Sequence, residues 1–257
     1  MKGVILAAGK GSRLNGTAGD KPKCLVEAGG VSLVQRQIRT LEAAGIDDIA
    51  VVVGCQADRV RAACGPRVEY VENARFAETN SLYSLWTARA LLYNGFVVLN
   101  CDVLFHPAML NDLLATHQDA ALLMEPRKPG DALFGDEEMK VKVRSGRVVD
   151  MSKTMDSAEA DGENVGIVKF GPRSAPHLVA ILDRIVTAGG LRDWAPRAFR
   201  EFAQELPLHA VHTGGRPWIE IDFPEDYHRA IHDILPAIDD AVRVPATLSA
   251  DAGGARK

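Results

Sequence analysis

The N-terminal stretch from Val4 to Arg13 constrains the fold of this chain more than any other segment. It reads Val4-Ile5-Leu6-Ala7-Ala8-Gly9-Lys10-Gly11-Ser12-Arg13. The apolar run at its start, bounded by glycine, predicts a fully buried β-strand. The two glycines predict a turn whose backbone N–H groups converge on an anion. Because glycine has no Cβ, a bulky phosphate can approach the backbone closely there.

Two basic residues strengthen this prediction. Arg13 stands two residues after the second glycine, and Lys23 follows Pro22. A guanidinium can bind phosphate through two parallel hydrogen bonds, whereas a lysine ammonium is a mobile point charge. A Gly-x-Gly pattern without such basic residues also occurs in ordinary strand-to-helix turns, which is the alternative interpretation of the two glycines. Together with Arg13 and Lys23 they predict a polyphosphate site, in which both basic residues are candidate catalytic residues.

The spacing excludes two other phosphate-binding loops. A Walker A loop requires Gly-Lys followed by Ser or Thr, and no such triplet occurs in the chain. The dinucleotide fingerprint requires a third glycine at the position of Leu14. A nicotinamide-dependent dehydrogenase is therefore disfavoured.

The remaining pattern predicts an α/β fold. Apolar runs at 49–53 and 96–100 predict buried strands, and two further strands are expected at 68–71 and 120–124. Helical patterns separate these strands, the first opening on a Ser32/Gln35 capping box. Strands that alternate with helices indicate a three-layer, Rossmann-like, mostly parallel sheet.

Alternating polar and apolar residues at 139–144 and 147–151, joined by Ser145-Gly146, predict a β-hairpin. We expect this hairpin to belong to a small lid, at about 127–165, inserted in a single domain of residues 1–236. The lid's polar stretch 153–163 is expected to be mobile. The polar, Ala- and Gly-rich residues 237–257 are expected to form a flexible tail.

Composition narrows the class of partner. The chain has 257 residues, 47% of them hydrophobic, which suffices for one large core. No apolar run approaches the roughly 20 residues that span a bilayer, and no signal peptide pattern is present. The net charge of −4 gives no reason to expect a nucleic-acid surface, and the four cysteines lack metal-binding spacing. These features favour a cytoplasmic protein without membrane insertion, for which a homodimer is a candidate assembly.

The motif Gly-x-Gly-x-Arg, eight residues, then Pro-Lys resembles the signature of nucleotidyltransferases that act on sugar phosphates and phospho-alcohols. The resemblance implies that this loop grips a nucleoside triphosphate. Asn15-Gly16-Thr17 replaces the usual Pro-Leu-Thr, which implies a looser middle of the signature. The implied nucleotide-binding residues are Leu6, Ala7, Ala8, Gly9, Gly11, Ser12, Arg13 and Lys23.

A second segment narrows the resemblance. In Glu78-Thr79-Asn80-Ser81-Leu82-Tyr83-Ser84-Leu85-Trp86, Thr79 or Asn80 can cap a helix. An Asn-Ser pair before a Leu-Tyr-Ser-Leu helix resembles the phosphocholine cytidylyltransferase group, in which this segment lies by the cytosine. The resemblance implies that Asn80 and Ser81 bind the base of CTP.

Three carboxylates are candidate metal ligands. Asp102 follows a buried strand, where ligands of open α/β sheets bind, although a helix cap is an alternative role. The sequence Trp218-Ile219-Glu220-Ile221-Asp222 resembles the family's C-terminal metal motif. The resemblance implies that Asp102 and Asp222, with Glu220 as a further candidate, hold Mg²⁺. Solvent exposure is the alternative for Glu220 and Asp222.

The resemblance also implies a site for the acceptor, the small molecule that receives the nucleotide. The lid at about 127–165 is then an acceptor-binding lid. The lysine after the hairpin and the Gly-Glu before the next strand correspond to Lys153 and Glu163, and we add Tyr83 as an aromatic candidate. The expected reaction transfers CMP from CTP to a small phospho-alcohol or phosphonate, such as phosphocholine, and releases pyrophosphate. Two alternatives remain: a sugar-1-phosphate nucleotidyltransferase using UTP, GTP or dTTP, and a non-catalytic nucleotide-binding regulatory module.

Overall fold

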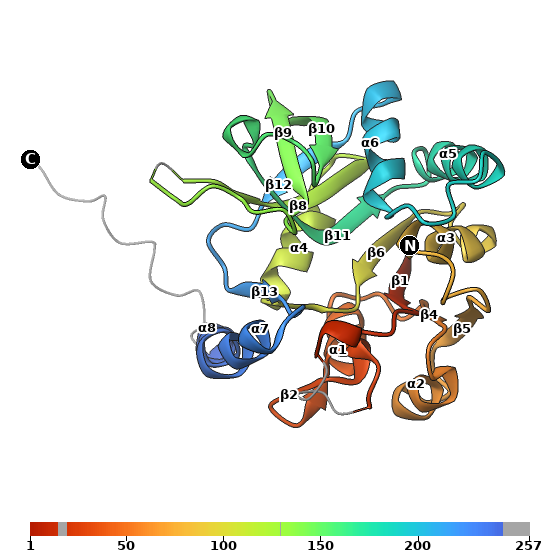
Figure 1. The fold of residues 1–257 in the computed structure, drawn as a ribbon, viewed down its shortest axis with the longest axis vertical. Helices are drawn as coiled ribbons and strands as arrows, with labels where there is room; N and C mark the ends of the chain where they lie inside the picture. The colour runs from red at the N-terminus through yellow and green to blue at the C-terminus, as the bar shows by residue number, and fades with distance from the viewer. Residues whose placement is uncertain (15–19, 129, 244–257) are drawn as a thin grey trace, which may run out of the picture.

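The computed structural model describes residues 1–14, 20–128 and 130–243. Within them the fold is built on one nine-stranded sheet, in the order β5-β4-β1-β6-β11-β8-β12-β10-β9 (Figure 1). Its strands are β1 (Lys2–Ala7), β4 (Ile49–Val53), β5 (Glu69–Glu72), β6 (Phe96–Asn100), β8 (Ala120–Pro126), β9 (Lys140–Arg144), β10 (Arg147–Ser152), β11 (Gly162–Phe170) and β12 (His209–His212). The expected α/β architecture is confirmed. The segment Asn15-Gly16-Thr17, which was predicted to be a looser part of the signature, lies outside the described residues.

The strand directions agree with a mostly parallel sheet. β1 is parallel to β4 and β6, and β4 is parallel to β5. β11 is antiparallel to both β6 and β8, so β8 runs in the direction of β1, and β12 is parallel to β8. β10 is antiparallel to β12, and β9 is antiparallel to β10. Among the nine strands of this sheet, only β10 and β11 are therefore reversed.

Helices cover both faces of the sheet and give the predicted three layers. One apolar core contains Leu82 of α3 (Ser81–Thr87), Leu178 of α5 (Ala175–Thr187) and Phe199 of α6 (Pro196–Glu205). The other contains Leu41 of α1 (Leu33–Ala43), Val60 of α2 (Ala57–Cys64) and Met109 of α4 (Pro107–Ala115). The Ser32/Gln35 capping box is present at the start of α1.

A third, smaller core joins the C-terminal part of the chain to the N-terminal part. Short strands β2 (Glu27–Ala28) and β3 (Val31–Ser32) pair, as do β7 (Val103–Phe105) and β13 (Trp218–Glu220). Leu14, Ile219 and Ile221 pack together with Leu235 and Ile238 of α8 (Leu235–Arg243). α7 (Pro224–Arg229) and a π-helical turn, η5 (Ala230–Ile234), connect β13 to α8.

The predicted lid requires correction. Its hairpin forms as expected, from β9 and β10, but it is part of the main sheet. β10 pairs with β12, and β9 also pairs with β11. Val148 and Met151 are buried in the core that α5 and α6 cover, so the hairpin is fixed by packing. The stretch expected to be mobile contains a 3₁₀ turn, η4 (Ser157–Glu159), and the start of β11.

The predicted start of the tail at residue 237 is also wrong. α8 continues to Arg243, and Ile238 is buried in the small core. Pro236 suggested the end of the domain, but it is the second residue of α8, which directly follows the π-helical turn η5, where the regular helical hydrogen-bond pattern is already interrupted, so the helix continues through it. Residues 244–257 of the expected tail lie outside the described residues.

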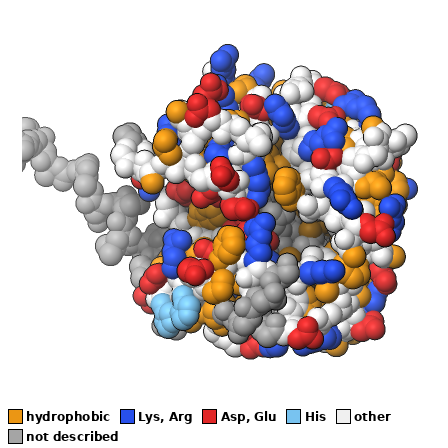
Figure 2. All heavy atoms as spheres, viewed as in Figure 1, with side chains coloured by type: hydrophobic (Ala, Val, Ile, Leu, Met, Phe, Trp, Pro, Cys, Tyr) orange, Lys and Arg blue, Asp and Glu red, His pale blue; other side chains and the backbone are white. Residues whose placement is uncertain are grey.

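The surface agrees with the modest net charge. Figure 2 shows basic and acidic side chains intermingled over the face that carries the central hollow. Within the part of the chain that the structure describes, no helix is long and apolar enough to cross a membrane.

Candidate active site

A cavity of about 330 Å³ lies at the carboxyl ends of β1 and β6. Its wall contains Leu6, Ala8, Gly9, Gly11, Arg13, Lys23, Phe76, Thr79, Asn80, Ser81, Ser84, Asn100, Cys101, Asp102, Glu137, Met139, Lys153, Asn164, Trp194, Pro196, Glu220 and Asp222. β1 and β6 are in register, Leu6 opposite Asn100, so both strands end at the same edge of the sheet. The two sequence segments that suggested a nucleotide thus meet at one cavity.

The glycines of the N-terminal turn have different roles. Gly11 has a φ of +66°, and a Cβ there would lie 2.6 Å from the Cβ of Lys23. This position therefore requires glycine for both conformation and space. A Cβ on Gly9 would meet no atom within 4 Å. Gly9 lines the cavity and leaves room for a bulky group beside the backbone.

Asp102, Glu220 and Asp222 form a carboxylate cluster on one side of the cavity. Each offers an oxygen within 4.8 Å of the others. β13 pairs with β7, with Glu220 opposite Val103, and the N–H of Ile221 donates to the carbonyl of Asp102 at 3.0 Å. This small sheet brings the C-terminal motif beside the end of β6.

The cluster fits a magnesium ion. Oδ1 of Asp102 is buried and has no hydrogen-bond partner among the described residues. Mg²⁺ prefers hard oxygen ligands and commonly takes one or two carboxylates together with substrate phosphates. Burial and the charges of Asp102 and Asp222 raise the pKa of Glu220 to about 8. A divalent cation would offset that repulsion between carboxylates.

Lys23 is held between two of these carboxylates. Its Nζ lies 2.7 Å from Oδ2 of Asp102 and also donates to Oδ1 of Asp222. Burial acts to lower the pKa of Lys23, but the charges of Asp102 and Asp222 outweigh it and raise the pKa above its ordinary value. Lys23 is therefore a permanent cation at this site and cannot act as a general base near neutral pH.

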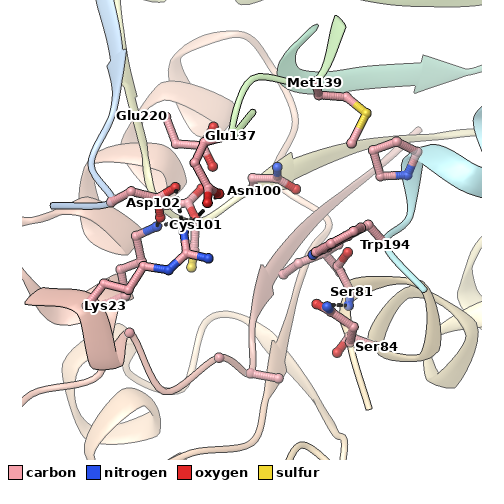
Figure 3. A pocket seen from close by; sticks show the side chains of 18 of the residues that line it. Lys23, Ser81, Ser84, Asn100, Cys101, Asp102, Glu137, Met139, Trp194 and Glu220 are labelled. Atoms are coloured by element: carbon pink, nitrogen blue, oxygen red, sulfur yellow. Dashed lines mark hydrogen bonds and ion pairs between the residues drawn. The ribbon is translucent and has the colours of Figure 1, made fainter. Parts of the chain in front are cut away.

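The opposite side of the cavity is formed by the start of α3, where Figure 3 shows Ser81 and Ser84 below Trp194. Asn80 caps the helix, as the sequence indicated, by accepting the N–H of Ser81 at 2.8 Å. Buried Asn73 donates to the hydroxyls of Thr79 and Ser84, at 3.1 and 3.0 Å. This network fixes two polar side chains toward the cavity.

A loop after α5 completes this side. The N–H of Ala195 donates to Oγ of Ser81 at 2.9 Å, and the N–H of Asn80 donates to the carbonyl of Leu191 at 3.0 Å. The loop thereby places Trp194 on the cavity wall, with Nζ of Lys153 lying 5.1 Å from the centre of its indole ring. Lys153 therefore lies at the cavity, where the sequence predicted an acceptor contact.

Three predicted site residues do not line the cavity. Ala7 is buried on the other face of β1, because alternate side chains of a strand point to opposite faces. Tyr83 packs its ring against Trp86 at 5.1 Å. Glu163 lies in β11 between Glu125 of β8 and Lys140 of β9. The side chain of Ser12 lies outside what the structure describes.

Other wall residues were not predicted from the sequence. Asn100 ends β6, Met139 directly precedes β9 and Asn164 is the third residue of β11, positions that only the sheet order brings together. Glu137 lies in a charged loop that gave no signal of a contact. Cys101 is buried, and its contact with Cys24, together with burial, raises the pKa of its thiol. A buried thiol with a raised pKa is a poor nucleophile, so Cys101 is best described as a wall residue.

Glu163 allows a test of the electrostatics next to the cavity. Burial and the charges of Glu138 and Glu125 raise its pKa to about 7, from an ordinary value of 4.5. The folded protein therefore binds this proton more tightly than the unfolded chain, and stability falls as the pH rises from about 4.5 to about 7. We expect Glu163→Gln to be equal to wild type near pH 4.5 and more stable at pH 8, by on the order of 1–3 kcal/mol.

Thermal or urea unfolding across pH 4.5–8 measures this difference. Glu159→Gln, which removes an exposed carboxylate paired with Lys142 at 2.7 Å in the same region, is the control and should be no more stable than wild type at pH 8. A Glu163→Gln variant that is no more stable than wild type at pH 8 would show that the carboxylate is well solvated or fully paired.

Comparison with known proteins defines the class of this site. The sequence profile described as the MobA-like NTP transferase domain matches residues 3–195. The chain belongs to this family and is a nucleotidyltransferase.

Individual relatives are similar along most of the chain. Choline-phosphate cytidylyltransferase of Streptococcus pneumoniae is 26% identical over 243 residues, covering 91% of this chain and 98% of that protein. CTP:phosphoglutamine cytidylyltransferase of Campylobacter jejuni is 24% identical over 248 residues, covering 88% and 97%. A solved structure of the Streptococcus pneumoniae CTP:phosphocholine cytidylyltransferase superposes with a TM-score of 0.73 at 26% identity, covering 89% of this chain and 96% of that chain.

Proposed function

We propose that this protein is a Mg²⁺-dependent cytidylyltransferase that joins CMP from CTP to the phosphate or phosphonate of a small acceptor, with release of pyrophosphate. One observation carries the proposal. A single cavity has Lys23 and a three-carboxylate cluster on one side, and the polar start of α3 with Trp194 on the other. The first arrangement suits phosphoryl chemistry, and the second suits a base or a small head group.

The reaction needs no general base. The second pKa of a phosphate monoester is about 6, so the acceptor is mostly dianionic near neutral pH and can attack directly. An acceptor oxygen would form a bond to the α-phosphorus of CTP, and the bond from that phosphorus to the bridging oxygen of pyrophosphate would break. The chain's task is to position two anions against their repulsion.

Different residues of the cavity would carry out separate parts of this task. The Gly9–Gly11 turn would bind the triphosphate, with Arg13 at its end. Lys23 would lie between donor and acceptor phosphates, where its permanent charge offsets their repulsion. Asp102, Asp222 and Glu220 would hold Mg²⁺, which when bound neutralises charge on the α-phosphate. Asn80 and Ser81 would contact the base, and Lys153 the acceptor.

The choice of CTP and a small acceptor has separate support. The start of α3 resembles the cytidylyltransferase segment, and the two relatives compared above are named for CTP and small phosphorylated acceptors. Trp194 is half-exposed at the cavity, and a cation over an indole face contributes roughly 0.5–2 kcal/mol. Choline phosphate is therefore the first acceptor to test. The single hairpin offers few groups for reading a ring of sugar hydroxyls, which disfavours a sugar 1-phosphate.

Competition among substrates tests this proposal. We expect CTP to be used at least tenfold faster than UTP, GTP or dTTP when all four are offered at equal concentration with Mg²⁺. The acceptor pool contains choline phosphate, aminoethylphosphonate, glycerol phosphate and sugar 1-phosphates, and products are identified by mass. A dominant UDP-, GDP- or dTDP-sugar would instead establish the sugar-phosphate alternative. Nucleotide binding with no pyrophosphate from any pair would favour the regulatory module.

A further inference from the structure

Glu137 connects two basic residues across the mouth of the cavity. Its Oε2 accepts from Nη1 of Arg13 at 3.1 Å and from Nζ of Lys153 at 3.2 Å. Arg13 belongs to a 3₁₀ turn after β1 (η1, Ser12–Leu14), and Lys153 follows β10. Figure 3 shows the Glu137 side chain reaching from its loop into the pocket, on the side of Asp102 and Glu220.

Two cations from distant elements therefore converge on one oxygen atom. The two cations define a binding position for an anion, which we call the seat, and the carboxylate of Glu137 occupies it. The hydrogen bond and charge of Lys153, followed by those of Arg13, lower the pKa of Glu137, so its carboxylate is charged at neutral pH. Nη1 of Arg13 also lies 3.7 Å from Oδ2 of Asp222, which places the seat beside the carboxylate cluster.

The exposure of these side chains indicates an exchangeable contact. Arg13 is 49% exposed, Glu137 51% and Lys153 24%. Ion pairs exposed to solvent contribute little net free energy, so this contact adds little to the stability of the fold. An incoming dianion with two to three suitably placed oxygens can replace a single carboxylate oxygen at low cost.

We infer that Glu137 occupies the seat of the acceptor's phosphate. The acceptor displaces Glu137 from the seat when it binds, and Glu137 displaces the product after the reaction. The inference rests on the proposed function for the identity of the acceptor. Lys153 and Trp194 place the seat on the side of the cavity proposed for the acceptor, and Arg13, at the end of the turn proposed for the triphosphate, places it where the two phosphates would meet.

The charge balance of the reaction gives Glu137 its role. Before attack, the acceptor's phosphate carries two negative charges and fully ionised CTP carries four. Attack forms the new P–O bond and expels pyrophosphate with four charges, so the product's acceptor and α-phosphates keep one each. The anion in the seat thus falls from −2 to −1. The single carboxylate of Glu137 competes poorly with a phosphate of charge −2 and well with a phosphate of charge −1. The competition therefore favours product release.

Calorimetric binding without nucleotide tests the seat directly. The probes are methyl phosphate, a dianion at pH 8, and dimethyl phosphate, a monoanion. Wild type is expected to bind methyl phosphate at least tenfold more tightly than dimethyl phosphate. Glu137→Gln should bind both probes at least threefold more tightly than wild type, because the competing charge is gone. Asp136→Asn, an exposed neighbour with the same charge change, should stay within twofold of wild type.

Other outcomes overturn the inference. Unchanged or weaker probe binding by Glu137→Gln would mean that Glu137 does not compete for the seat. Glu137→Asp keeps the charge and should stay close to wild type, so weakening in both variants would indicate only a disturbed loop. Tightening seen with pyrophosphate but not with methyl phosphate would assign the seat to the donor.

Turnover separates this inference from the proposed function. With CTP and an acceptor, Glu137→Gln should lower the acceptor KM at least threefold, strengthen product inhibition and slow product release. Tighter probe binding by a protein that never turns over CTP would overturn the proposed function alone. Normal turnover with unchanged acceptor KM and product inhibition in Glu137→Gln would overturn the inference alone.

Discussion

Asp102→Asn and Asp222→Asn are each expected to lower turnover by about 10²–10³-fold at saturating Mg²⁺, with the fold intact. Each substitution removes a charge from the carboxylate cluster while keeping the side-chain shape. Oδ1 of Asp102 has no protein partner among the described residues, so its loss removes a contact that only a ligand would use.

Steady-state kinetics with Mg²⁺ titration, together with circular dichroism, measures this effect. Asp240→Asn, which removes an exposed carboxylate on α8, is the matched control. Turnover of the Asp102 and Asp222 variants within threefold of wild type would rule out a metal site built on these residues.

Lys23→Ala is expected to slow the single-turnover rate by at least about 10²-fold, while nucleotide affinity changes less than tenfold. The reason is its position between Asp102 and Asp222, where donor and acceptor phosphates would meet. Its removal also leaves Asp102 without its ion pair and Asp222 with only the 3.7 Å contact to Arg13, so Mg²⁺ should raise the Tm of the variant more than that of wild type.

Rapid-quench kinetics and thermal unfolding with and without Mg²⁺ provide both measurements. Lys21→Ala is the control, because Lys21 lies two residues away and pairs with Glu27 at 2.9 Å. If nucleotide affinity collapses in Lys23→Ala but the bound-state rate survives, Lys23 only grips the nucleotide.

Features encoded in a few adjacent residues were predicted well from the sequence. The strand before Gly9, the capping box of α1, the Asn80 cap and the Ser145-Gly146 hairpin each depend on local backbone chemistry. The apolar strands were also found, because burial on both faces leaves a continuous apolar run.

Features set by distant contacts were not predicted. β12, with the sequence His-Ala-Val-His, is only partly buried and carries no clear apolar pattern. Tyr83 was assigned to the acceptor because aromatic residues suit a cationic head group, but the turn of α3 directs it toward Trp86. Trp194 reaches the cavity because its loop bonds to the start of α3, and Glu137 because its loop meets Arg13. No spacing in the sequence encodes these meetings.

The pairing of β13 with β7 has a consequence for the stability of the proposed metal site. The family profile ends at residue 195, yet two of the three clustered carboxylates, Glu220 and Asp222, lie beyond it. They are held beside Asp102 by this short ladder and by the small core beneath α8. Local opening of the segment 218–243 would carry both carboxylates away together. Fraying of the C-terminal segment and release of the metal would then be one event, and metal binding would keep that segment closed.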